Sequence, residues 1–128
     1  MDADTRVDRI RRVCRREQLA DGGKAVRFSI ARQGQTLSAF AIAHDGHVHA
    51  YVNICPHRGT SLDWQPGEVF DESGLYLICA THGALFAPDT GLCIAGPCQG
   101  ACLQKIPLTL EAGNVALEHD MLANFTDA

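Results

Sequence analysis

Two short motifs, each combining one cysteine with one histidine, constrain the fold of this chain more than any other feature. Residues 55–57 read Cys-Pro-His and, after 21 further residues, residues 79–82 read Cys-Ala-Thr-His. The two motifs stand on separate loops. If the fold brings these loops together, two thiols and two imidazoles can meet at one metal centre. The sequence therefore predicts a scaffold that holds two loops side by side.

The spacing of the apolar residues predicts that this scaffold is made of β-strands. Apolar residues recur with period two more often than with the 3.6 period of a helix. Asp45-Gly46 between two alternating runs is typical of a hairpin turn. We expect strands at residues 25–30, 36–43, 47–52, 75–78, 84–87, 92–95, 104–111 and 115–118. Eight or nine short strands at this spacing predict an all-β fold, an antiparallel β-sandwich or partial barrel.

The length of the chain, 128 residues, suits one domain. We expect a single domain over residues 1–128, with a core at about residues 13–118 and frayed ends at 1–11 and 121–128. Residues 55–74 and 95–103 lack periodicity and are rich in Gly and Pro. Long irregular loops on a compact β scaffold usually carry function, so these two segments are expected to form a binding subdomain.

Composition and charge exclude several classes of protein. The net charge of −4 argues against nucleic-acid binding, which needs clustered Lys and Arg. No apolar run approaches the roughly 20 residues that span a membrane. The first 24 residues contain no secretory apolar stretch of about 7–15 residues, which predicts a cytoplasmic protein. Residues 1–16 carry +3 and the rest −7, so the Arg-rich start is either a solvated leader or a docking arm for an acidic partner.

The mixture of ligand types within each motif separates zinc from iron. In a reducing compartment, cysteines act as metal ligands, reactive thiols or small buried hydrophobes. Zinc sites favour arms that each supply like ligands, two Cys or two His. Here each arm supplies one of each. That mixture suits a two-iron centre in which one iron takes both thiolates and the other takes both imidazoles.

The sequence around the motifs resembles the Rieske family. Residues 55–59 (Cys-Pro-His-Arg-Gly) and 79–83 (Cys-Ala-Thr-His-Gly) match the two ligand loops of that family, including the glycine after each. Residues 96–97 (Gly-Pro) resemble its proline loop, which covers the cluster from a third side. The resemblance extends over about residues 13–118, and the paired motif is highly specific.

The resemblance implies the cofactor and its ligands. It implies one [2Fe–2S] cluster, with Cys55 and Cys79 on one iron and His57 and His82 on the outer iron. Two thiolates and two neutral imidazoles leave the oxidised centre without net charge, whereas four thiolates would leave −2. Adding an electron to a neutral centre costs less, so the potential is higher than that of plant-type ferredoxins.

The residues at four positions indicate where the reduction potential of the cluster is expected within the range of Rieske proteins. High-potential respiratory members of the family carry a disulfide between the ligand loops, and the aligned residues here are Thr60 and Thr81. They also carry a Ser and a Tyr that donate hydrogen bonds to cluster sulfurs, and these positions hold Ala84 and Phe86. Without these donors the reduced cluster is less stabilised. We expect a low-potential centre, toward the bottom of about −150 to +300 mV.

The resemblance implies a small one-electron carrier without catalysis of its own. The implied partners are a flavin reductase on one side and an oxygenase or another oxidoreductase on the other. The chain is too short for a Rieske oxygenase, which adds a large domain with a second, mononuclear iron site. Two alternatives are a non-catalytic subunit of a larger oxidoreductase and a redox sensor. A structural zinc module is the remaining alternative.

The other cysteines have several interpretations. Cys93, Cys98 and Cys102 surround the Gly-Pro loop, where they are buried hydrophobes or incidental thiols, a redox-sensing thiol or, least favoured, a second metal site. Cys14 is expected to be structural or incidental.

The remaining histidines and the long first loop are also ambiguous. His47 and His49 are expected on one strand face beside His44, as surface residues rather than a metal site. Residues 61–74 are either a partner-docking lip with Trp64 as its anchor or a solvated loop, and the acids there are expected to be solvated.

Overall fold

The computed structural model describes residues 10–32, 35–56, 61–63, 65–79, 83–97, 99–118 and 126–127. These residues form eleven β-strands and one 3₁₀ helix, η1 (Arg16–Gln18), which confirms the predicted all-β fold. All strand-to-strand pairings are antiparallel. Within the described residues, no helix is long and apolar enough to cross a membrane.

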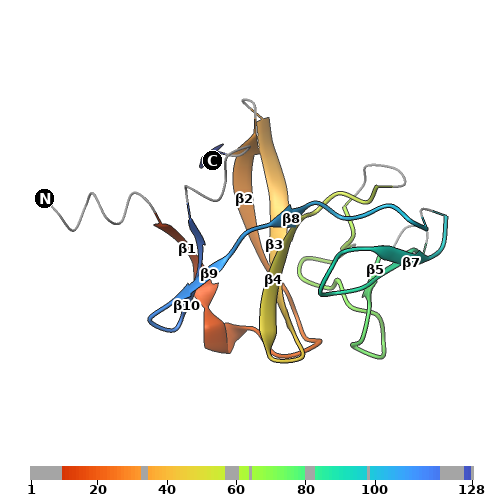
Figure 1. Cartoon of the computed structure of the whole chain (residues 1–128), viewed down its shortest axis with the longest axis horizontal. Helices are drawn as coiled ribbons and strands as arrows, with labels where there is room; N and C mark the ends of the chain where they lie inside the picture. Colours follow the sequence, from red (N-terminus) through yellow and green to blue (C-terminus); the bar gives the residue numbers. More distant parts are fainter. Residues whose placement is uncertain are drawn as a thin grey trace, which may run out of the picture.

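The strands form three sheets (Figure 1). The largest has the order β11-β2-β3-β4-β8, and its strands are β11 (Thr126–Asp127), β2 (Val26–Arg32), β3 (Gln35–His44), β4 (His47–Val52) and β8 (Lys105–Ile106). The second has the order β1-β10-β9, and its strands are β1 (Ile10–Arg15), β10 (Asn114–Glu118) and β9 (Thr109–Glu111). We call these two sheets together the β body. The third has the order β5-β6-β7, with β5 (Leu77–Ile78), β6 (Leu85–Phe86) and β7 (Cys93–Ala95).

The turn between β3 and β4 is the predicted tight hairpin turn. His44 pairs with His47, which leaves the two-residue connection Asp45-Gly46. Both residues have positive φ, 52° for Asp45 and 79° for Gly46. A tight hairpin of this kind needs positive φ at both central positions, and Asp-Gly is the sequence that adopts it most readily.

Strand β3 separates two hydrophobic cores. Phe40 and Ile42 belong to one core, and the alternate residues Ala39, Ala41 and Ala43 belong to the other. Successive side chains of a strand point to opposite faces, so one strand contributes to both cores. The alanine face packs between the two sheets of the β body, and the Phe-Ile face packs toward the third sheet.

Two sequence-based expectations are wrong at strand boundaries. The strand expected at 104–111 is divided between two sheets, because β8 pairs with β4 and β9 pairs with β10. Pro107 lies between them and has no N–H to donate to a ladder. The strand expected at 75–78 begins at Leu77, whereas Leu75 is 56% exposed. A turn closed by the Asp71 N–H to Tyr76 O hydrogen bond occupies the preceding residues.

The ends expected to be frayed contain paired strands. Ile10 pairs with Glu118 in β1–β10, and Asp127 pairs with Ile30 in β11–β2. Backbone pairing needs no apolar side chain, so the polar sequence of these ends did not indicate it. Residues 1–9, 119–125 and 128 of the expected ends lie outside the described residues.

Candidate metal centre

Both predicted motifs lie in a long excursion from the main sheet. Residues 53–104, which we call the insert, leave the end of β4 and return as β8. These two strands are antiparallel neighbours, and the Val52 N–H donates to Gln104 O at 2.9 Å where the insert begins and ends. Figure 1 shows β5 and β7 to one side of the β body. The insert therefore projects from one edge of the scaffold.

The two predicted cysteine ligands lie in the same hydrophobic core. Cys55 and Cys79 are each 0% exposed, and both belong to the core that contains Leu62, Phe86 and Leu103. The fold thus buries in one core two cysteines that are 24 residues apart in sequence. The two predicted histidine ligands, His57 and His82, lie outside the described residues.

Short backbone hydrogen bonds close the loop that begins at Cys79. The Cys79 N–H donates to Ala84 O at 2.9 Å, and the Gly83 N–H donates to Cys79 O at 2.8 Å. The N–H of the preceding residue, Ile78, donates to Val69 O at 2.8 Å, which ties this loop to the first irregular segment. Backbone contacts therefore fix the start of the second motif on both sides.

Gly96, in the Gly-Pro segment predicted to cover the centre, lies directly against Ala84, which follows the second motif. Gly96 has a φ of +103°, which side-chain-bearing residues rarely adopt. A Cβ atom at this position would lie 2.8 Å from Ala84 Cα. Only glycine permits this close approach, so the packing of residues 96–97 on the second loop follows from the sequence.

The chemistry of the two described ligand candidates, Cys55 and Cys79, fits an iron–sulfur cluster. Thiolates are soft ligands that select Fe–S clusters, Cu(I) and Zn over hard cations. Ala84 and Phe86, which occupy positions that carry hydroxyls in respiratory members of the family, are both 0% exposed. Among the described residues, no group of three or more His, Cys, Asp or Glu residues could hold a metal ion. Cys55 and Cys79 are therefore the described half of the predicted four-ligand set.

The other described cysteines lie in different environments. Cys93 is 1% exposed, and its Sγ donates to Ala95 O at 3.3 Å, whereas Cys102 is exposed. Cys98 lies outside the described residues. Cys14 is buried in the core of the β body, as expected for a structural residue, and burial raises the pKa of its thiol.

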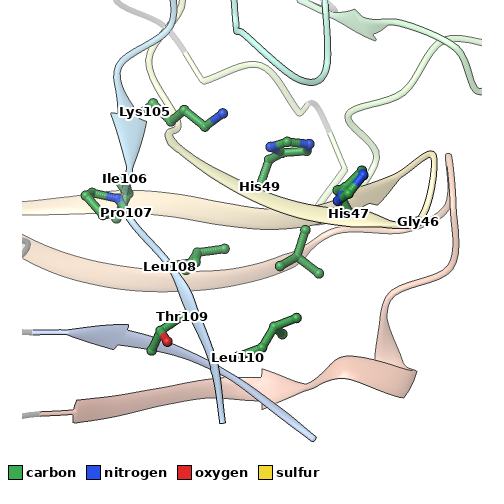
Figure 2. Close-up of a pocket in the computed structure, with 10 residues that line it drawn as sticks. Gly46, His47, His49, Lys105, Ile106, Pro107, Leu108, Thr109 and Leu110 are labelled. Carbon is green, nitrogen blue, oxygen red and sulfur yellow. The ribbon is translucent and has the colours of Figure 1, made fainter.

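The predicted histidine pair lines a groove far along β4 from the cysteines. His47 and His49 project to the same side of the strand, as expected for residues two apart (Figure 2). The groove has a volume of about 840 Å³, and its other wall is the segment from Lys105 to Leu110. Burial first and Lys105 second lower the pKa of His49. His44 instead stacks on Phe70, with ring centroids 6.5 Å apart.

The expectation that the acids of residues 61–74 are solvated is wrong for Asp63. Its side chain is 1% exposed, and its carboxylate accepts hydrogen bonds from Asn53 Nδ2 at 2.8 Å and from the Gly67 N–H at 3.0 Å. Sequence reasoning also missed Asn53, which is 2% exposed. The sequence did offer one indication of a buried polar contact, because Asn53 is a polar residue at the end of an apolar strand, two positions before Cys55. Trp64 lies outside the described residues.

Comparison with known proteins agrees with this arrangement. The model of the Rieske [2Fe–2S] domain family matches residues 10–115. The ferredoxin component of an alkene monooxygenase system from Xanthobacter autotrophicus is 34% identical over 105 residues, which are 82% of this chain and 77% of that protein.

Solved structures are similar over most of the chain. A ferredoxin of Sphingomonas yanoikuyae B1 superposes with a TM-score of 0.63 and 25% identity, over 84% of this chain and 95% of that one. A chain from the complex of reduced oxygenase and oxidized ferredoxin in carbazole 1,9a-dioxygenase gives 0.65 and 20%, over 88% and 94%. The terminal oxygenase of carbazole 1,9a-dioxygenase from Novosphingobium sp. KA1 gives 0.65 and 24%, over 87% of this chain but 30% of that one. The last two share the fold.

The family match covers most of the chain, and the cysteines of the two predicted motifs are buried in one core. The chain belongs to the Rieske [2Fe–2S] family, and it is an electron carrier that binds a [2Fe–2S] cluster.

Proposed function

We propose that Cys55, His57, Cys79 and His82 hold the cluster, with both thiolates on one iron and both imidazoles on the other. The observation that carries this proposal is the complete burial of Cys55 and Cys79 in one core. The close packing of Gly96 on Ala84 supports it, because it brings a third loop against the second motif. When bound, the cluster supplies one-electron oxidation and reduction.

We propose further that the protein passes electrons from a flavin reductase to an oxygenase or a related oxidoreductase. The similar protein from Xanthobacter is the ferredoxin component of a monooxygenase system, which supports this role. Ala84 and Phe86 offer no hydroxyl to the cluster, so the potential is expected toward the lower end of about −150 to +300 mV. The proposal includes a single-domain chain, a cytoplasmic location, and protein rather than nucleic-acid partners.

Metal and sulfide analysis of the purified chain tests the ligand set. We expect two irons and two acid-labile sulfides per chain, with a red-brown colour. Cys55→Ser and Cys79→Ser are expected to abolish the cluster, because thiolates are its ligands. Cys102→Ser, which changes an exposed thiol, is the matched control and should keep it. A colourless protein with one zinc per chain would contradict the proposal.

Electrochemistry and turnover test the role of the carrier. Voltammetry is expected to give a midpoint in the lower part of the Rieske range, and a midpoint above about +100 mV would contradict the low-potential assignment. An NADH-dependent flavin reductase should reduce the protein, and a terminal oxygenase should then oxidise it. Substrate turnover by that pair without this protein would argue against the carrier role.

A further inference from the structure

Asn53 stands at the start of the loop that carries the first motif. It is 2% exposed and lies two residues before Cys55. Its backbone N–H donates to Ser38 O in β3 at 2.8 Å. The loop therefore begins at a point fixed to the β body.

The side chain of Asn53 joins the two ends of this loop. Its Oδ1 accepts a hydrogen bond from the Leu62 N–H at 2.8 Å, and its Nδ2 donates to Asp63 Oδ1 at 2.8 Å. These bonds hold together the two ends of residues 53–63, the stretch whose sequence contains the Cys-Pro-His motif. Both the oxygen and the nitrogen of the Asn53 amide form hydrogen bonds, which fixes the orientation of the side chain as well as its position.

Asp63 connects the far end of the loop to the β body. Its side chain is 1% exposed, its Oδ2 lies 3.3 Å from Arg27 Nε in β2, and the same oxygen accepts from the Gly67 N–H. Arg27 Nη2 also donates to Ser38 Oγ at 3.1 Å. A buried carboxylate is costly unless it is paired and hydrogen-bonded, and here donors from three residues face it. Removing the carboxylate would leave the buried amide of Asn53 and the Gly67 N–H without their acceptor.

We propose that Asn53 and Asp63 are positioning residues for the cluster, which hold both ends of the first ligand loop at a fixed place on the β body. This inference rests on the proposed ligand set, in which Cys55 and His57 lie inside that loop. Fixed loop ends restrict the conformations of the residues between them, so the ligands are held ready before the metal binds.

Exchanging the two side chains tests the proposal. Asn53→Asp places a second carboxylate against Asp63 Oδ1, and Asp63→Asn removes the buried charge and one acceptor. We expect each single variant to lose iron to excess chelator about tenfold faster or more, and to shift the g-values of the reduced EPR spectrum. The double variant N53D/D63N restores a carboxylate-amide pair, with an acceptor for each N–H of Leu62 and Gly67. The double variant should lose iron nearly as slowly as wild type, and its reduced EPR spectrum should return close to that of wild type.

Tyr51→Phe is the matched control. It removes a buried hydrogen bond, from Tyr51 Oη to Pro88 O at 2.6 Å, that lies outside the first ligand loop. Iron loss should stay within about twofold of wild type. The proposal is overturned if the single variants keep iron like wild type, if the exchange recovers nothing, or if Tyr51→Phe accelerates iron loss as much.

Amide exchange in the iron-free chain separates this proposal from the proposed function. We expect the Leu62 and Gly67 amides to be protected without metal, and to exchange about tenfold faster in Asp63→Asn. A wild-type chain that binds no [2Fe–2S] cluster would refute the proposed function. Unprotected amides in a chain that does bind the cluster would refute the positioning role alone.

Discussion

The β body and the insert are stabilised in different ways. In the β body, β2 and β3 pair over seven residues and β3 and β4 over six. In the insert, β5 and β6 have two residues each and β7 has three. Individual contacts, such as those of Asn53 and Asp63, replace the ladder there. The comparison teaches that the scaffold depends on a repeated backbone pattern, whereas the site depends on particular residues.

Removal of the cluster should produce the largest difference in stability between the insert and the β body. Without metal, the insert loses a group that the proposed ligands Cys55 and Cys79 would hold, and its strands are too short to compensate. We expect amide exchange in described residues 69–79 to accelerate about tenfold or more, while β2–β4 stay protected. Hydrogen exchange with mass spectrometry, before and after chelation under reducing conditions, measures this. Equal loss of protection in both regions would show that they unfold as one unit.

Alanine at two glycines with positive φ compares the regions directly. Gly96→Ala combines backbone strain with a Cβ atom 2.8 Å from Ala84 Cα, so we expect a loss of about 3 kcal/mol or more and a depleted cluster. Gly46→Ala has nothing within 4 Å of the new Cβ, so strain alone should cost about 1–2 kcal/mol. Urea unfolding and iron content give both quantities. Equal losses would argue that space around Gly96 is unimportant.

Tyr51→Phe probes the boundary between the regions. Tyr51 belongs to β4, and its hydroxyl donates to Pro88 O in the insert. Burial first and Asp89 second raise the pKa of this hydroxyl, which therefore stays protonated and able to donate. Losing the bond leaves a buried carbonyl without its donor, which should lower the free energy of unfolding by about 1–2 kcal/mol. Urea unfolding measures the loss, and an unchanged midpoint would contradict it.

The smallest expected effect concerns pH and lies in the β body. The pKa of His49 is lowered, so the unfolded chain binds a proton there at a higher pH than the folded chain does. The contribution of His49 is therefore complete above about pH 6.5 and is lost as the pH falls. His49→Gln should reduce the loss of stability between pH 7.5 and about 5.5, and Lys105→Gln should reduce it less. Urea unfolding at both pH values checks this, and an unchanged slope in His49→Gln would contradict it.

Sequence reasoning predicted the central strands β3 and β4 well, because alternation and the Asp45-Gly46 turn are local patterns. The two motifs singled out Cys55 and Cys79, which the fold buries in one core. The contacts of Asn53 with Asp63 were missed because they join irregular segments, where no periodicity indicates which side chain is buried. The pairing of β11 with β2 was missed for a related reason, since its partner lies about a hundred residues away.

The insert leaves the main sheet after Val52 and returns at Gln104, so it is a self-contained segment of the chain. Its ends meet on neighbouring antiparallel strands, so in topology the whole insert is one very long hairpin loop. Such a segment can lengthen, shorten or be transplanted between proteins while the strand order of its host stays the same. For an engineer, a new host needs two hydrogen-bonded strands with Cα atoms about 5.5 Å apart, and groups that replace Arg27 and Ser38 as partners of the insert.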